Sequence, residues 1–263
     1  MLRITHEAQM HEQNCFVTLT YDDKLLPRGY TAESLEYAHY QRFMRRVRLV
    51  KPGVRFFVCG EYGEDNLRPH FHACLFDVDF PDRVLRGKSQ SGEEFDDSAI
   101  VRGLWSYGNV SVQELNRTTA SYCARYCVDK MTGDPDTMSP EMRARWLARY
   151  QYVDAEGEVR ERVPEFSRCS LKPGIGSRWF DKYHRDIYRH DRAVLSGGGV
   201  LAPPKYYDRL MRRADRYIDE EGAIDLARVK RAQRCVADST PERLAVREVV
   251  HKARVSRQRR NGV

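Results

Sequence analysis

The fold is decided by two apolar runs, Val54–Cys59 (VRFFVC) and His70–Phe76 (HFHACLF). Both are rich in aromatic and β-branched residues, and the polar stretch Gly60–Leu67 separates them. Short apolar runs bounded by turn residues are typical of strands. The sequence therefore predicts two neighbouring strands joined by a polar turn.

The residues before this pair predict a further strand and a helix. Cys15–Tyr21 is β-branched and aromatic and reads as a strand. Thr31 can cap a helix that ends at Pro52-Gly53 and carries Tyr40, Phe43, Met44 and Val47 at helical spacing. The order strand, helix, strand, turn, strand indicates an α+β fold, with helices packed on a largely antiparallel central sheet.

The residues after the pair extend this pattern. A helix is expected over Ala99–Trp105, a short strand over Asn109–Val112, and a helix over Ala120–Met131 capped by Thr118 or Thr119. Residues 81–97 are polar and predict a surface insertion. Residues 133–163 are charged and irregular, with one helical stretch around Met142–Tyr150.

The last quarter of the chain has a different character. Gly197–Gly199 lies between two apolar pairs and fits either a linker or a hairpin turn. After Pro203-Pro204 the chain is expected to be helical and basic to its end. The predicted division is a domain over residues 1–190, which includes both insertions, and a C-terminal hairpin and helical extension over residues 191–263.

Composition narrows the possible function. The 263 residues include 45 Lys and Arg against 38 Asp and Glu, and the net charge of +7 favours an anionic partner such as nucleic acid. No apolar run approaches the ~20 residues of a membrane span, and the N-terminus has no apolar signal core. The seven cysteines are an odd number without a Cys-x-x-Cys pair, which argues against a disulfide framework or a zinc finger.

One phosphate-binding motif is excluded. Gly87-Lys88-Ser89 looks like the end of a P-loop, but Asp82 stands where the first glycine of that motif would fall. The chain therefore shows no sign of an ATPase or helicase of its own.

A histidine pair is the sharpest local feature. In a strand, His70 and His72 project to one face while Phe71 points into the core. Glu61 lies nine residues before His70, and a turn would bring its carboxylate opposite the pair. Two imidazoles and one carboxylate can hold a divalent ion and leave positions open for substrate oxygens. The alternative is a chance pair that only forms hydrogen bonds.

The second feature is a tyrosine pair. On a helix, Tyr122 and Tyr126 share one face, and Lys130 follows one turn later. The pair alone would suggest core packing, and Lys130 alone a solvated residue. Together with a metal clamp, the pair suggests attack of a tyrosine oxygen on a DNA phosphodiester, with Lys130 or the metal helping the phenol to lose its proton.

This combination resembles the HUH endonucleases, and within them the rolling-circle replication initiators of microviruses, the gokushovirus-like single-stranded DNA phages. Four stretches carry the resemblance over about residues 15–210: Phe16–Tyr21, Cys59–His72, Tyr122–Lys130, and Lys172–Gly176 with Trp179-Phe180 and Pro203–Asp208. The resemblance does not cover residues 81–97, residues 133–163 or the tail after Met211.

The resemblance implies a fold, a cofactor and a reaction. The fold would be a ferredoxin- or RRM-like antiparallel sheet flanked by helices. Glu61, His70 and His72 would hold Mg²⁺ or Mn²⁺, with Glu64 the substitute for Glu61. One tyrosine would nick the replication origin and stay joined to the 5′ phosphate. The second would later release the displaced strand as a circle, without ATP.

The resemblance also implies partners and a place of action. These are single-stranded DNA, the origin of the double-stranded replicative form, and host helicase and polymerase in the bacterial cytoplasm, with no membrane partner. The rivals are a two-tyrosine HUH transposase, a plasmid initiator, and a non-catalytic DNA-binding protein of the same fold.

Several cations are candidates for DNA contact. Arg125, Lys172 and Arg178 lie within or beside the resembling stretches. The tail from His251 to Val263 has no acid and adds five more cations: Lys252, Arg254, Arg257, Arg259 and Arg260. Non-specific contact with phosphates and a solvated, partly disordered end are both compatible with this tail.

Overall fold

The computed structural model describes residues 1–26, 32–63, 66–88, 92, 94–125, 134–154, 156–195, 198–213 and 218–260, without the side chains of 218–221, 223 and 255–260. The chain divides into two compact units. Residues 1–87 and 94–178 form the first, and residues 88–93 and 179–263 form the second.

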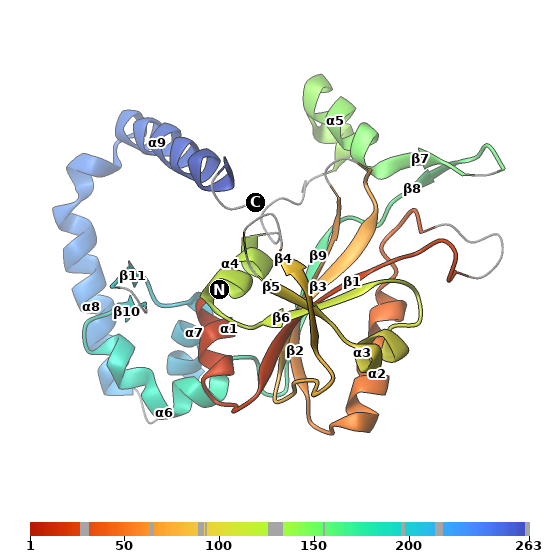
Figure 1. The fold of residues 1–263 in the computed structure, drawn as a ribbon. Coiled ribbons are helices and arrows are strands. Elements are labelled where there is room, and N and C mark those ends of the chain that lie inside the picture. The colour runs from red at the N-terminus through yellow and green to blue at the C-terminus, as the bar shows by residue number, and fades with distance from the viewer. Residues whose placement is uncertain are drawn as a thin grey trace. The chain divides into compact units, whose positions relative to one another are not determined.

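A seven-stranded sheet forms the centre of the first unit (Figure 1). Its order is β4 (Val84–Lys88), β5 (Glu94–Asp97), β6 (Val110–Glu114), β1 (Asn14–Thr20), β3 (Pro69–Phe76), β2 (Arg55–Tyr62) and β9 (Phe166–Cys169). The pairings from β5 to β9 are antiparallel. The predicted α+β fold with an antiparallel central sheet is confirmed.

Strand β2 is longer than predicted. The sequence suggested a turn from Gly60, but Gly60, Glu61 and Tyr62 continue the strand opposite Phe71, His70 and Pro69. Glycine and glutamate are weak strand formers, so the local pattern ends early. Pairing along β3 extends the strand through Glu61.

Strand β9 has no counterpart among the predicted elements. It pairs with β2 on the side away from β3 and places Phe166 beside Gly60. A Cβ atom at Gly60 would lie 3.1 Å from Phe166 Cζ, so the glycine makes room for that ring.

The prediction of a simple surface insertion at residues 81–97 is wrong. Strands β4 and β5 add to the sheet edge, and Asp96 of β5 pairs with Val112 of β6. Much of this arm is nevertheless exposed, and Arg83 links it through hydrogen bonds to Asp79 and Asp96. Polar strands at an edge carry little apolar signal, which explains the error.

Helices cover both faces of the sheet (Figure 1). Helix α2 (Tyr37–Val50) and helix α3 (Ala99–Leu104) lie on the face of Phe71, and their apolar side chains join one core. Helix α1 (Leu2–Ala8) and helix α4 (Arg117–Arg125) cover the other face, where Ile4, Ala120 and Cys123 pack against the strands.

Two helix starts differ from the prediction. Helix α2 begins at Tyr37, where the Glu36 carboxylate accepts from Ala38 N, and Thr31 lies outside the described residues. Helix α4 begins at Arg117 because Asn116 caps it: Asn116 Oδ1 accepts from Thr119 N at 3.0 Å, and Thr119 Oγ1 accepts from Asn116 N at 3.0 Å. Residues 126–133, the last part of that predicted helix, are not described.

The segment predicted to be irregular contains more structure than expected. The helix near Met142 is confirmed as α5 (Pro140–Tyr150), after a 3-10 turn at Pro135–Thr137. A hairpin follows, in which β7 (Gln151–Val153) pairs with β8 (Val159–Glu161).

The second unit is helical, as predicted. It holds most of α6 (Ser177–Tyr188), then α7 (Lys205–Arg213), α8 (Ile218–Arg234), a 3-10 turn at Val236–Ser239, and α9 (Pro241–Arg260). The glycine segment belongs to a hairpin, because β10 (Ala193–Val194) pairs with β11 (Val200–Leu201). In the described part of the chain, no helix is apolar and long enough to cross a membrane.

Candidate functional site

Strand register brings three candidate ligands to one face of the sheet. Glu61 of β2 lies opposite His70 of β3, and Cys59 lies opposite His72. Alternation along β3 sends the two imidazoles toward the α4 face, whereas Phe71 is fully buried in the core beneath α2. The orientation derived from the sequence is therefore the one observed.

The three side chains converge closely. Glu61 Oε1 lies 2.7 Å from His70 Nε2 and 2.7 Å from His72 Nε2. Their ligand atoms all lie within 4.8 Å of one another, which is close enough to share a metal ion. Glu61 is only 3% exposed and His72 only 5%, so the carboxylate and this imidazole sit in a largely dry environment.

The outer nitrogen of each imidazole is held in place. His70 Nδ1 lies 3.0 Å from Arg68 O and donates to it, because a carbonyl only accepts. His72 Nδ1 lies 2.9 Å from Thr18 Oγ1 on β1. Both rings thus present Nε2 toward Glu61. Second contacts of this kind fix the orientation of metal-binding histidines.

The charges of the three groups are coupled. Burial opposes the charged form of His70, but hydrogen bonding and the charge of Glu61 raise its pKa above the usual value. Burial lowers the pKa of His72 despite the same carboxylate. Burial favours the neutral form of Glu61, yet the two imidazoles bring its pKa below the usual value. The group is therefore suited to an ionised carboxylate.

One oxygen of the group is left over. Glu61 Oε2 is buried and has no hydrogen-bond partner among the described residues. A buried carboxylate oxygen without a partner is unfavourable. A divalent cation between two imidazoles and this carboxylate would satisfy it, and the donor set suits a metal that accepts both nitrogen and oxygen. The residues present therefore fit the implied metal.

Tyr122 lies directly beside this group. Its hydroxyl is 3.4 Å from His72 Nε2, and its ring stands edge-on to the His72 ring with centroids 4.8 Å apart. Beneath it, the thiols of Cys59 and Cys123 lie 3.5 Å apart and both contact His72 O. Small buried thiols let α4 approach the sheet closely, so they place Tyr122 over the histidines.

The other predicted residues fall into two groups. Tyr126, Lys130 and the alternative ligand Glu64 lie outside the described residues. Arg125 is half-buried at the end of α4, whereas Lys172 and Arg178 are exposed. Lys252 and Arg254 are exposed on α9, and Arg257, Arg259 and Arg260 belong to the same helix without described side chains.

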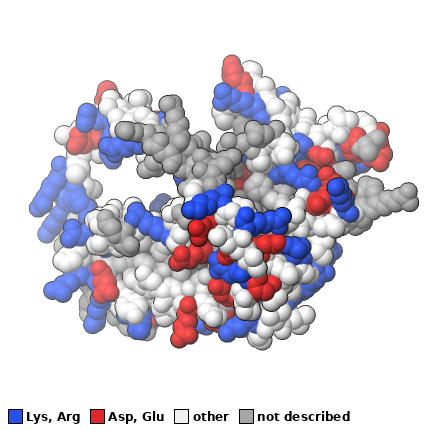
Figure 2. All heavy atoms as spheres, in the orientation of Figure 1, with Lys and Arg blue, Asp and Glu red and all other residues white. Residues whose placement is uncertain are grey.

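Charge is distributed unevenly on the visible face. Figure 2 shows Lys and Arg side chains gathered along α8 at the left edge, whereas both signs are mixed over the sheet-containing unit. Lys230, Arg231 and Arg234 of α8 are exposed. The sequence pattern indicated α9 and not α8 as a basic surface. The alternation of acids with cations earlier in α8 hides this end in the overall composition.

Thr18 is a site residue that the sequence analysis missed. It faces His72 in the register between β1 and β3. Thr18 and Thr20 alternate with the buried Val17 and Leu19, so the sequence did hold a signal that both threonines share the face opposite the core.

Glu7 and Arg55 were also missed. Arg55 donates to Glu7 and, at 2.6 Å, to Pro173 O, and Gly176 N donates to Glu7 Oε2 at 2.6 Å. This buried pair fixes the Lys172–Gly176 loop to α1 and β2. No local pattern indicates it, because the loop lies more than 100 residues away from both partners along the chain.

An α+β sheet that carries a Glu–His–His group beside a tyrosine defines the class, and comparisons with known proteins place the chain among its relatives. Residues 14–131 match the family of the phage replication-associated protein ORF2. The chain is 29% identical to the replication-associated protein VP4 of Bdellovibrio phage phiMH2K over 78% of its length, and 28% identical to ORF2 of Spiroplasma virus 4 over 77%. It is 26% identical to ORF4 of Chlamydia phage 1 over 85%.

These matches confirm the resemblance to phage replication proteins. The chain spans 60%, 59% and 51% of the lengths of the three relatives in that order. No solved structure matches it significantly.

Proposed function

We propose that the chain initiates rolling-circle replication of a small single-stranded DNA phage by cutting one DNA strand at the origin. The observation that carries this proposal is the Tyr122 hydroxyl beside His72, within a group that can hold a metal. The names of the three phage relatives support a role in DNA replication.

The chemical step is a transesterification. The phenolic oxygen of Tyr122 attacks a DNA phosphorus, a Tyr–O–P bond forms and the bond to the 3′ oxygen breaks. The phenol proton passes to a base, and the leaving 3′ oxygen takes up a proton. The products are a 5′-phosphotyrosine and a free 3′ hydroxyl, so the phosphodiester energy is conserved in the adduct.

Each residue of the site has a role in this step. Glu61, His70 and His72 would hold Mg²⁺ or Mn²⁺, which polarises the phosphate and favours loss of the phenol proton. The Thr18 hydroxyl and Arg68 carbonyl keep the imidazoles oriented. We assign Tyr126 the second transfer, which closes the displaced strand into a circle, and Lys130 a supporting charge.

The reaction assigns partners in the bacterial host. A free 3′ hydroxyl is a primer for a host polymerase, and a host helicase would open the duplex, since the chain lacks a P-loop motif. The cations Arg125, Lys172 and Arg178 are proposed to contact the DNA backbone.

Labelled oligonucleotides test the proposal. Single-stranded fragments that carry candidate origins are incubated with the protein and Mn²⁺, then denatured in detergent. A label at the 3′ end should migrate with the protein, because the tyrosine keeps the 5′ phosphate. A label at the 5′ end should appear on a free fragment that a polymerase can extend.

Two variants complete this experiment. Tyr122→Phe together with Tyr126→Phe should abolish the adduct, while Tyr152→Phe, which removes a phenol from strand β7, should leave it unchanged. DNA binding without any adduct or cleavage would instead identify a non-catalytic DNA-binding protein.

A further inference from the structure

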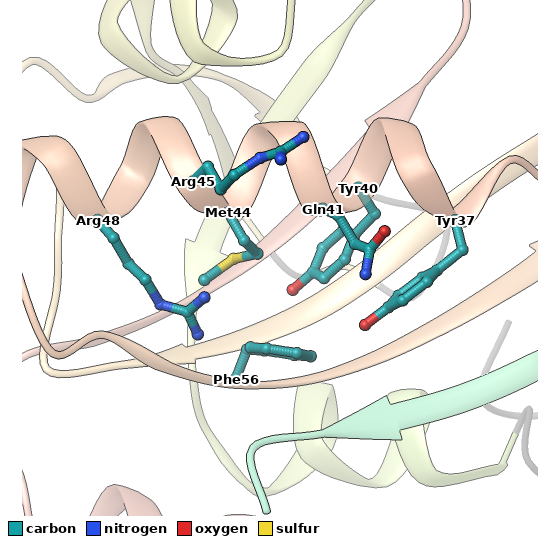
Figure 3. Close-up of a pocket in the computed structure, with 7 residues that line it drawn as sticks. All are labelled: Tyr37, Tyr40, Gln41, Met44, Arg45, Arg48 and Phe56. Atoms are coloured by element: carbon teal, nitrogen blue, oxygen red, sulfur yellow. The ribbon is translucent and has the colours of Figure 1, made fainter.

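A second cavity lies on the opposite face of the sheet from the metal group. It has a volume of about 230 Å³ and opens between α2 and β2 (Figure 3). Tyr40, Met44, Arg48 and Phe56 are among the residues that line it. Its size is below that of pockets for drug-sized ligands, which suits one planar ring with a small substituent.

Aromatic rings form its walls. The Tyr37 and Tyr40 rings are nearly parallel with centroids 6.0 Å apart, and Phe56 stands edge-on to Tyr40 at 5.4 Å. Figure 3 shows Tyr37 and Tyr40 reaching from α2 toward Phe56 on β2. Stacking surfaces of this kind accept any nucleobase, because every base has a π face.

Cations surround these rings. Arg45 and Arg48 line the cavity, and Arg168 of β9 lies over the Tyr37 ring at 4.8 Å. Gln41 of α2 adds an amide group to the lining, and none of the described lining residues is acidic. Aromatic surfaces edged by arginine match a ligand that joins a ring to a phosphate.

The Tyr40 hydroxyl is a second, independent sign of a ligand. It is buried and has no hydrogen-bond partner among the described residues. In Figure 3 it points from α2 into the space above Phe56. A buried hydroxyl without a partner is unfavourable, and the polar edge of a base would satisfy it.

We propose that this cavity binds one nucleotide of single-stranded DNA outside the cleavage site. The base lies against Tyr37 and Phe56 with an edge toward the Tyr40 hydroxyl, and the neighbouring phosphates contact Arg45 and Arg48. The inference rests on the proposed function for the presence of single-stranded DNA. The cavity would hold the strand at a point where no bond is cut.

The test measures DNA binding without cleavage. Anisotropy of a labelled oligothymidylate is followed with the full chain in EDTA, so nicking plays no part. Tyr40→Phe should weaken binding about fivefold without lowering the melting temperature, because it removes only an unpartnered hydroxyl. Arg45→Ala with Arg48→Ala should weaken binding about tenfold more than Arg42→Ala, a control on the same helix whose guanidinium contacts Tyr107.

Two further measurements locate the ligand. An oligonucleotide that contains 5-iododeoxyuridine should crosslink to a peptide with Tyr37 or Phe56. Thymidine 5′-phosphate and inorganic phosphate should compete far more weakly than the oligonucleotide. Crosslinking with these affinity losses supports the site even if no origin is ever cut, so the two proposals fail separately.

Three outcomes would overturn the inference. The first is wild-type affinity in both Tyr40→Phe and the arginine double variant. The second is crosslinking confined to other segments. The third is equal competition by the mononucleotide, which would make the cavity a site for free nucleotides.

Discussion

Glu61 and His70 stand directly opposite each other on β2 and β3, with Glu61 Oε1 2.7 Å from His70 Nε2. This pairing exists because β2 continues two residues beyond Gly60. A shift of the register by one residue would turn Glu61 toward the α2 core and separate it from both imidazoles. The candidate metal group thus depends on strand pairing as much as on residue type.

The first prediction concerns removal of the metal. Nicking of single-stranded origin DNA should vanish in EDTA and return with Mn²⁺ or Mg²⁺. His70→Ala and His72→Ala should each lower the nicking rate on the order of 10³-fold, because polarisation of the phosphate is lost. Salt-sensitive DNA binding should largely persist in a gel-shift assay. Full activity in the double variant would refute the site.

Thr18 should tune metal binding without being a ligand. Thr18→Val removes the hydroxyl that contacts His72 Nδ1 and keeps a branched side chain. Affinity for Mn²⁺, measured by titration calorimetry, should fall about tenfold. Thr18→Ser should restore most of it, and an unchanged affinity in Thr18→Val would exclude the positioning role.

The tyrosine pair should separate initiation from termination. Tyr122→Phe and Tyr126→Phe each remove a nucleophile and keep the ring, so packing should barely change. If the phenols are interchangeable, each single variant should nick but fail to release circles through repeated rounds, and the double variant should form no adduct. An adduct in only one single variant would make the pair asymmetric.

An adduct in the double variant would contradict the assignment. Tyr62 and Tyr107 are then poor substitutes, since the Tyr62 hydroxyl donates to Val163 O and Tyr107 stacks on His39 beneath α2. Both belong to the core on the α2 side of the sheet, away from the face of Glu61.

The helical tail should contribute to electrostatic binding. Truncation after Arg247 removes the second half of α9 with its exposed Lys252 and Arg254. Affinity for single-stranded DNA should fall, and the salt slope should flatten by about 0.7 for each phosphate that the shortened chain no longer neutralises. Cleavage position should not change. A constant slope over a salt titration would show that the tail is only a solvated helix end.

His6 should make stability fall in mild acid. Burial on α1 lowers its pKa from 6.5 to about 4, so the unfolded chain binds more protons between these values. The free energy of unfolding from this group should therefore decrease by about 1.3 kcal/mol from pH ~7.5 to pH ~5.5. Urea unfolding of the wild type and His6→Gln at both pH values measures the difference.

The control for this prediction is an exposed histidine. His251 lies on the surface of α9, and His251→Gln should keep the pH dependence of the wild type. The same pH dependence in His6→Gln as in the wild type would show that His6 does not govern acid sensitivity.

The sequence by itself determined the elements whose signal is local. Strands β1, β2, β3 and β6 follow from apolar and β-branched runs, and the buried face of α2 follows from helical spacing. The alternation of His70, Phe71 and His72 also fixed which side chains share a face, because side chains in a strand point alternately to its two sides.

Only the tertiary structure decided the contacts between segments that are distant along the chain. These include the pairing of β9 with β2, the addition of β4 and β5, the Thr18–His72 contact, and the Glu7–Arg55 anchor. A cross-strand neighbour or a buried ion pair leaves no periodic trace in either segment. Its stability comes from burial and register, which exist only once the chain has folded.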